Sequence, residues 1–172
     1  MERVRQPSVT GEKETAAGPS SFEEFFRAEH VRLFRALYLV TGSVQEAEDL
    51  MQESFVRVWE RWDRVAGMER PAGYLYRTAM NAFRSRTRRA MRAARRPFAR
   101  ASGTDQLGAV EERDEVVRVL RTLSPRQRQA LVLTEYVGYS SEEAATVMGV
   151  KAATVRALAH QGRQAIQGTP DE

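Results

Sequence analysis

Apolar side chains recur at helical intervals through most of this 172-residue chain. Between Phe22 and Val40 they return every three or four residues, which places them on one face of an α-helix. Further runs of the same period follow, and each ends at a glycine, a proline or a serine that stops one helix and caps the next. No stretch alternates apolar and polar residues as a strand does, and no hairpin dipeptide occurs. The pattern predicts an all-α fold.

Helix-breaking residues divide these helices into two groups. The first group is expected to hold helices from Phe22 to the stop at residues 41–43, over about 44–62, and from Pro71 to about Ala94, with a loop at 64–70. The second is expected to hold a helix through residues 116–123, one from Pro125 towards Gly138, a short one from Ser140 or Ser141 to Met148, and a last one over about 152–167.

Composition sets the domain boundaries. Residues 1–20 carry too few large apolar groups to offset the entropy of ordering them, so we expect a disordered tail. Residues 97–110 are small and polar and are expected to form a flexible linker. We therefore predict two helical domains joined by a flexible linker, with the boundaries 1–20, 21–96, 97–110 and 111–168.

Several function classes are excluded by residue content. The chain has no cysteine, so disulfides, thiolate zinc sites and cysteine nucleophiles are absent, and its two histidines, His30 and His160, are far apart in sequence. No nucleophile–base pair or glycine-rich phosphate loop is present. No apolar run approaches the ~20 residues of a membrane helix. We expect a cytoplasmic protein that is not an enzyme and binds no metal or cofactor.

Residues 141–158, SEEAATVMGVKAATVRAL, have the spacing of a helix-turn-helix. Ala145 supplies the small contact between the helices and Gly149 the turn. The second helix of such a motif presents its outward residues to duplex DNA. Gly162 weakens that helix by ~1 kcal/mol relative to alanine, so its end is expected to fray. The outward set is Lys151, Thr154, Arg156, Ala157, His160, Gln161 and Arg163.

The helix from Pro71 carries a polar stripe. Residues 77–96 contain many arginines and no acidic residue. An aromatic ring, an amide and several guanidinium groups on one helix face suit single-stranded DNA, because bases stack on the ring and arginines hold phosphates. The stripe consists of Tyr74, Arg77, Asn81, Arg84 and Arg88, with Thr78 and Ser85 between them.

These stretches, in this order, resemble the extracytoplasmic-function (ECF) class of bacterial RNA polymerase sigma factors. The similar segments are AEDLMQESFVRVWERWD (47–63) with PAGYLYRTAMNAFRSRTRR (71–89), and LSPRQRQALVLTEYVGYSSEEAATVMGVKAATVR (123–156). The first segment corresponds to sigma domain 2, a helical bundle. The second corresponds to sigma domain 4, which holds the helix-turn-helix.

The resemblance implies partners and roles. In this family the AEDLMQE-type helix binds the β′ clamp helices of core RNA polymerase, which implicates Asp49, Gln52 and Glu53. The stripe from Tyr74 to Arg88 would capture and open the −10 promoter element as melted single strand. The outward residues 151–163 would read the −35 element as duplex. An anti-sigma factor is a further candidate partner, and no membrane partner is expected.

Two departures from the family pattern bear on the −35 contact. Residues 156–163 are less basic than is usual, and Thr134 stands where an arginine is frequent. The resemblance therefore implies weaker or unusual −35 binding. The alternative is a helix-turn-helix regulator that acts without core polymerase, although the acidic helix followed by a basic one in the first domain argues against it.

Overall fold

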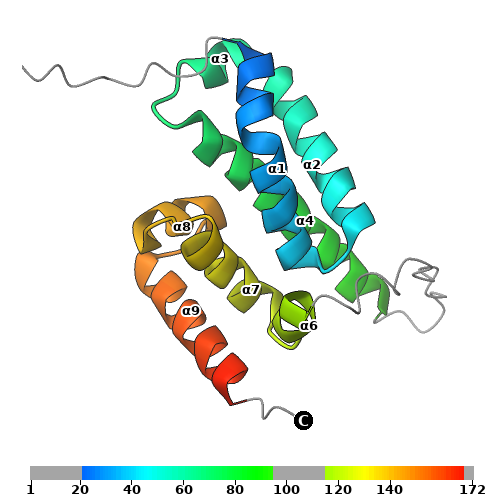
Figure 1. Ribbon diagram of the computed structural model, residues 1–172, viewed down its shortest axis with the longest axis vertical. Helices are drawn as coiled ribbons and strands as arrows, with labels where there is room; N and C mark the ends of the chain where they lie inside the picture. Colours follow the sequence, from blue (N-terminus) through cyan, green and yellow to red (C-terminus); the bar gives the residue numbers. More distant parts are fainter. Residues whose placement is uncertain (1–20, 95–114, 169–172) are drawn as a thin grey trace, which may run out of the picture.

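The computed structural model describes residues 21–94 and 115–168, and this part of the chain is helical without a strand (Figure 1). The predicted all-α class and its two helical domains are confirmed. The predicted tail (1–20), the predicted linker (97–110) and the predicted start of the second domain at residue 111 lie outside the described residues. None of the described helices is both long enough and apolar enough to cross a membrane.

The first domain consists of α1 (Phe22–Thr41), α2 (Val44–Trp59), α3 (Trp62–Ala66) and α4 (Pro71–Ala94). The Ser21 Oγ caps α1 by accepting from the Glu24 N–H at 3.2 Å, and Ser43 caps α2 in the same way. Gly42 ends α1 at φ 72°, a left-handed conformation that glycine adopts without steric cost. The buried faces of these helices form one apolar core.

The prediction of a single helix over 44–62 is wrong, and the loop predicted at 64–70 is confined to residues 67–70 because α3 occupies 62–66. Helix α2 ends at Trp59, and the chain turns before α3 begins at Trp62. The turn directs the Trp62 ring onto Phe22 and Phe25, with ring centroids 5.6 and 5.2 Å apart. Helical spacing alone puts Trp59 on the apolar face of α2, yet 63% of it is exposed.

The second domain consists of α6 (Glu115–Arg121), α7 (Pro125–Leu131), η1 (Val132–Tyr136), α8 (Ser141–Met148) and α9 (Ala152–Gln167). The η1 segment is a π-helical turn, closed by the Val137 N–H on Val132 O at 2.9 Å, which the sequence did not predict. Ser140 rather than Ser141 caps α8, in a capping box with Glu143.

The helix-turn-helix predicted over 141–158 is present as α8 and α9. Gly149 links them at φ 66°, and its N–H reaches the Ala145 carbonyl. The fraying predicted after Gly162 is wrong, because α9 continues to Gln167 and Gly162 is buried against α7.

The two domains pack against each other through one continuous set of buried residues. Helix α8 lies against α4, while α6, α7 and η1 contact α1 (Figure 1). The seam contains an edge-to-face pair of Tyr76 on α4 and Tyr139 before α8, with centroids 5.6 Å apart.

Candidate nucleic-acid and protein interfaces

The polar stripe of α4 lies opposite its buried face. The buried face includes Leu75, Ala79, Ala82 and Phe83. Of the five stripe residues proposed to contact a single strand, three are exposed and two are half-buried. The exposed ones are Arg77, Asn81 and Arg88, and the half-buried ones are Tyr74 and Arg84.

Three side chains of the stripe already have partners. The Tyr74 hydroxyl accepts from Arg61 Nη1 at 3.1 Å. The guanidinium of Arg84 donates to the Asn81 Oδ1 and, from its other nitrogen, to the Met148 carbonyl at the end of α8. The amide proposed to contact a base is therefore engaged by a neighbouring arginine, which in turn is held by the second domain.

Positive charge is concentrated around Arg84. Burial lowers the pKa of its guanidinium, and the charges of Arg88, Arg126 and Arg77 lower the pKa further. All three of these neighbours are cations, so the local field disfavours a further positive charge. A polyanion placed along α4 would relieve this repulsion.

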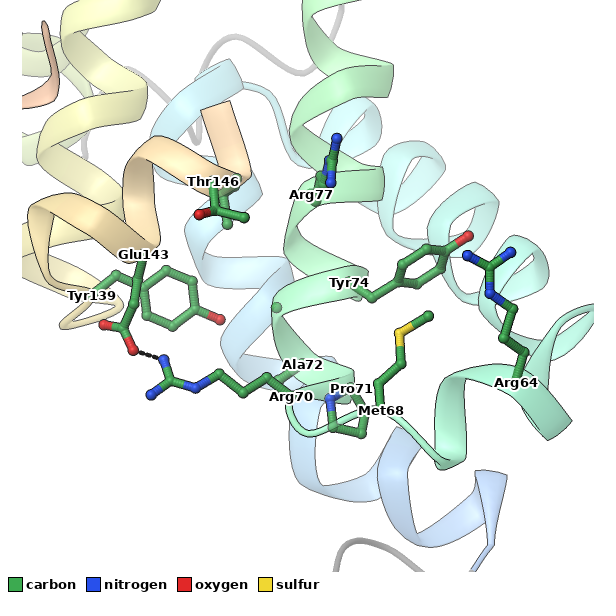
Figure 2. A pocket seen from close by; sticks show the side chains of 12 residues that line it. Arg64, Met68, Arg70, Pro71, Ala72, Tyr74, Arg77, Tyr139, Glu143 and Thr146 are labelled. Atoms are coloured by element: carbon green, nitrogen blue, oxygen red, sulfur yellow. Dashed lines mark ion pairs between the residues drawn. The ribbon is translucent and has the colours of Figure 1, made fainter. Parts of the chain in front are cut away.

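A cleft of about 580 Å³ separates the first turns of α4 from α8. Figure 2 shows Tyr74 and Arg77 on one side, Glu143 and Thr146 on the other, and the ion pair of Arg70 with Glu143 across it. Sequence reasoning missed the second-domain half of this lining, because nothing in the periodicity of α8 indicates which helix it faces.

The acidic face of α2 is partly neutralised within the first domain. Glu53 forms ion pairs with Arg57 at 2.6 Å and with Arg86 of α4 at 2.9 Å. Asp49 lies 4.0 Å from Arg86. Gln52 is exposed. Arg86 thus offsets acidic charge on α2, and the two helices do not carry fully separate faces of opposite sign.

An open apolar groove lies beside these acidic residues and was missed from the sequence. It is formed by α1 and α2, and Val56 and Trp59 on its rim are 53% and 63% exposed. Large apolar side chains this exposed on one helix face are typical of a protein contact. The groove is lined by Phe22, Glu23, Phe26, Arg27, Gln52, Phe55, Val56 and Trp59.

The outward set of α9 is confirmed as exposed apart from Thr154, which is half-buried. Two of its three cationic side chains are paired within the domain. Arg156 contacts Glu142 at 3.2 Å and Arg163 contacts Glu135 at 2.7 Å. The Thr134 hydroxyl of η1 donates to the Ala130 carbonyl of the preceding helix α7 at 2.9 Å. Lys151, Ala157, His160 and Gln161 complete the exposed set.

Within the part of the chain that the structure describes, no group of three or more histidine, aspartate or glutamate side chains could hold a metal ion.

Two family models match the chain. "Sigma-70 region 2" covers residues 25–93, and "Sigma-70, region 4" covers residues 113–166. The first spans most of the helices of the first domain and the second spans those of the second domain.

Curated relatives are sigma factors. The chain is 30% identical over 142 residues to the RNA polymerase sigma-E factor of Streptomyces avermitilis, covering 81% of this chain and 79% of that protein. It is 34% identical over 176 residues to the ECF RNA polymerase sigma factor SigE of Mycolicibacterium smegmatis, covering 92% of this chain and 64% of that protein.

Solved structures share the fold. The sigma factor RpoE in complex with the anti-sigma factor NepR, from Bartonella quintana, aligns with a TM-score of 0.66 at 22% identity, over 85% of this chain and 94% of that one. CnrH in complex with the cytosolic domain of CnrY aligns with a TM-score of 0.61 at 24% identity, over 85% and 84%. Both likenesses include the two helical domains.

Proposed function

The chain belongs to the extracytoplasmic-function class of the sigma-70 family, and on that premise we propose that it binds core RNA polymerase, recognises promoters and starts their melting. The observation that carries this proposal is the order of two interfaces in one chain. A helix with an aromatic, amide and arginine stripe precedes a helix-turn-helix whose second helix faces outward.

The polymerase surface is proposed to lie on α2. Asp49, Gln52 and Glu53 supply polar contacts to the β′ clamp helices, and the adjacent groove supplies apolar area through Val56 and Trp59. Protein interfaces usually have an aromatic or apolar centre surrounded by a polar rim.

The −10 surface is proposed to lie on α4. A flipped base would stack on the Tyr74 ring, and the Asn81 amide would hydrogen-bond to a base edge. Arg77, Arg84 and Arg88 would neutralise phosphates along the same face. Unpaired bases would be held better than duplex, and this differential binding would offset the few kcal/mol that unstacking costs.

The −35 surface is proposed to be α9, through Lys151, Thr154, Arg156, Ala157, His160, Gln161 and Arg163. The ion pairs of Arg156 and Arg163 support weak binding there, because each must be broken or shared before the guanidinium neutralises a phosphate. The inward-turned hydroxyl of Thr134 supports the same conclusion.

Residues 21–96 would thus act as sigma domain 2 and residues 111–168 as sigma domain 4, in the cytoplasm, without catalysis. An anti-sigma factor is a further proposed partner. The sigma factor RpoE, whose fold is similar, is seen in complex with the anti-sigma factor NepR.

The test is reconstitution with purified core polymerase and a pool of promoter fragments. We expect transcripts that require the chain, and co-elution of the chain with core. A chain that binds promoter duplex but not core would support the alternative, a helix-turn-helix regulator that acts without polymerase. Absence of core binding would overturn the proposal.

A further inference from the structure

A further cavity lies between the two domains and shares no lining residue with the cleft of Figure 2. It has a volume of about 440 Å³ and is formed by residues 83–91 of α4 and residues 124–129 at the start of α7, so we call it the α4–α7 cavity. Ligand pockets in proteins usually hold about 300–1,000 Å³. The surfaces proposed above for polymerase and DNA include no residue of α7, so that half of the cavity has no assigned role.

Three arginines line the α4–α7 cavity. Arg84 and Arg88 come from α4, and Arg126 comes from α7. In the part of the chain that the structure describes, no ion pair joins any of the three to a carboxylate. Arg86, on the same stretch of α4, instead pairs with Glu53 at 2.9 Å. The cavity therefore gathers positive charge that the described residues do not neutralise.

These like charges act on one another. Burial lowers the pKa of the Arg84 guanidinium, and the charges of Arg88 and Arg126 lower the pKa further. Arg84 donates to the Asn81 side chain and to the Met148 carbonyl, which leaves N–H groups of its five-donor fork for another acceptor. An anion that carries several charges on neighbouring atoms, such as a diphosphate, would relieve the repulsion and accept paired bonds from the guanidiniums.

Another wall of the cavity is apolar. Phe83 and Met91 of α4 both line it, and Phe83 is 4% exposed whereas Met91 is 55% exposed. An aromatic ring and a polarisable thioether make favourable contacts with flat rings. An inorganic anion would leave this wall uncovered, so the lining suits a ligand that joins an apolar ring to its charged group.

A buried acceptor without a donor also lines the cavity. Gln129 is 1% exposed, and its Nε2 donates to Met80 O at 3.4 Å. Its Oε1 has no hydrogen-bond partner among the described residues, and a buried acceptor left in that state destabilises the fold. An amide oxygen accepts from O–H and N–H groups and does not bond to an ionised phosphate. The ligand should therefore bring a hydroxyl or an N–H as well as its anion.

We propose that the α4–α7 cavity binds a free nucleoside di- or triphosphate. The three arginines hold the phosphates, and Phe83 and Met91 contact the base. Gln129 Oε1 accepts from a hydroxyl or an N–H of the nucleoside. This class of ligand joins the multiply charged anion, the flat ring and the hydrogen-bond donor that the three parts of the lining require.

A nucleotide within a DNA strand has similar chemistry but suits the cavity less well. Each phosphodiester of a strand carries a single charge, whereas the phosphates of a free diphosphate concentrate several charges beside the three guanidiniums. Arg84 and Arg88 belong to the proposed −10 surface as well. The variants below therefore change Arg126, Gln129 and Met91, which we assign to neither DNA nor polymerase.

The test is isothermal titration calorimetry on the full chain, without core polymerase or DNA. The probes are ADP, adenosine and pyrophosphate, so that the nucleoside and the anion are also measured apart. Arg126→Gln removes one charge from the cavity. The matched control is Arg118→Gln, which removes the same charge from an exposed position on α6 of the same domain.

We expect ADP to bind the wild-type chain at one site, about ten-fold more tightly than pyrophosphate, and adenosine to bind more weakly than either. Arg126→Gln should weaken ADP binding about ten-fold relative to Arg118→Gln, equivalent to ~1.4 kcal/mol, because a charge-assisted contact is lost. No ADP binding to the wild-type chain would overturn the proposal. Equal losses in the two arginine variants would overturn it as well, since they would indicate attraction by net charge alone.

Gln129→Met tests the nucleoside half of the site. Methionine fills a similar volume without a polar atom, so we expect ADP affinity to fall about three-fold or more while pyrophosphate affinity is unchanged. If circular dichroism shows this variant unfolded, the exposed Met91→Ala replaces it, with the same expected pattern. ADP and pyrophosphate that bind the wild-type chain equally well would overturn the nucleotide assignment.

A tetrathymidylate probe separates a free nucleotide from a strand. If Arg126→Gln weakens binding of this oligonucleotide but leaves ADP affinity unchanged, the cavity receives DNA and the proposal is overturned. The site does not depend on the proposed function, because the titrations contain no polymerase or promoter. A chain that binds ADP as expected yet gives no core-dependent transcripts would contradict the proposed function alone.

Discussion

At the scale of single residues, Tyr74 separates two contributions to strand binding. Its ring lines the cleft while its hydroxyl is engaged by Arg61 at 3.1 Å. Stacking depends on the ring and contributes ~1–3 kcal/mol per base. We expect Tyr74→Ala to weaken capture of the melted strand by the polymerase complex about ten-fold or more, and Tyr74→Phe to be nearly neutral. Both should bind core normally in a pull-down. A phenylalanine variant as defective as the alanine variant would show that the hydroxyl, not the ring, matters.

Trp59 and Trp62 provide a matched pair for the polymerase surface. Trp59 is 63% exposed on the rim of the groove, whereas Trp62 packs on Phe22 and Phe25. We expect Trp59→Ala to leave the free energy of unfolding within about 0.5 kcal/mol and to weaken core binding about thirty-fold, as loss of an aromatic anchor of ~2 kcal/mol does. Trp62→Ala should instead lower stability by about 2 kcal/mol.

Denaturant titration and core-binding titration on both variants check this prediction. Normal core affinity in Trp59→Ala would remove the groove from the polymerase surface.

Glu29 gives a pH-dependent prediction. Burial raises the pKa of its carboxyl above the ordinary 4.5, and the Arg32 charge opposes this in part. Its Oε2 is buried without a hydrogen-bond partner. The folded chain thus binds this proton more tightly than the unfolded chain. The protonated carboxyl therefore contributes fully to the free energy of unfolding below pH 4.5, and this contribution is lost as the pH rises through the raised pKa.

We therefore expect Glu29→Gln to raise the free energy of unfolding by roughly 0.5 kcal/mol at pH 7, discounted for partial exposure, and to make no difference below pH 4.5. The exposed Glu48→Gln is the control. Denaturant unfolding of the wild-type and variant chains at pH 7 and below pH 4.5 measures the effect. A difference in the free energy of unfolding between wild type and Glu29→Gln that is equal at the two pH values would contradict the prediction.

At the scale of helices, replacing either of two helical glycines with alanine should change the stability of the fold in opposite directions. A Cβ on Gly162 of α9 would lie 2.8 Å from Leu131 Cδ1, whose side chain is itself buried. A Cβ on Gly73 of α4 would meet nothing closer than 3.7 Å. Alanine stabilises a helix interior by ~0.5–1 kcal/mol relative to glycine, whereas overpacking costs ~1–3 kcal/mol.

We expect Gly162→Ala to lower the melting temperature, with a net loss of about 1 kcal/mol, and Gly73→Ala to raise it, with a gain of about 0.5 kcal/mol. Thermal unfolding by circular dichroism compares them directly. A stabilised Gly162→Ala would show that α9 does not approach α7 as closely as described.

The same glycine illustrates what the sequence could and could not predict about the elements. Caps and stops are local, so Ser43, Gly42 and Gly149 marked their helix ends correctly. The close approach of α9 to α7 is a tertiary contact, which local sequence does not reveal. From the sequence alone, Gly162 was therefore expected only to weaken its helix. The division of 44–62 into α2 and α3 was missed for the same reason, since the turn depends on where Trp62 packs.

At the scale of the whole molecule, the sequence predicted each candidate surface but not how the surfaces are arranged. The stripe of α4 and the outward set of α9 follow from helical spacing. Where the two domains meet, Arg84 of α4 and Arg128 of α7 each donate to a backbone carbonyl of the other domain, and no sequence pattern indicates which carbonyl an arginine will reach. The Trp59 groove was missed because apolar residues on a helix are assigned by default to the core.

The central claim is that this chain brings core polymerase to a promoter and opens the −10 element. Permanganate reactivity of thymines around −10 measures that opening directly, in mixtures of promoter, core polymerase and the chain. We expect reactivity only when all three are present. Tyr74→Ala should reduce it while still binding core, and Trp59→Ala should reduce it because it binds core more weakly. Melting that is independent of the chain, or promoter binding without any melting, would contradict the account.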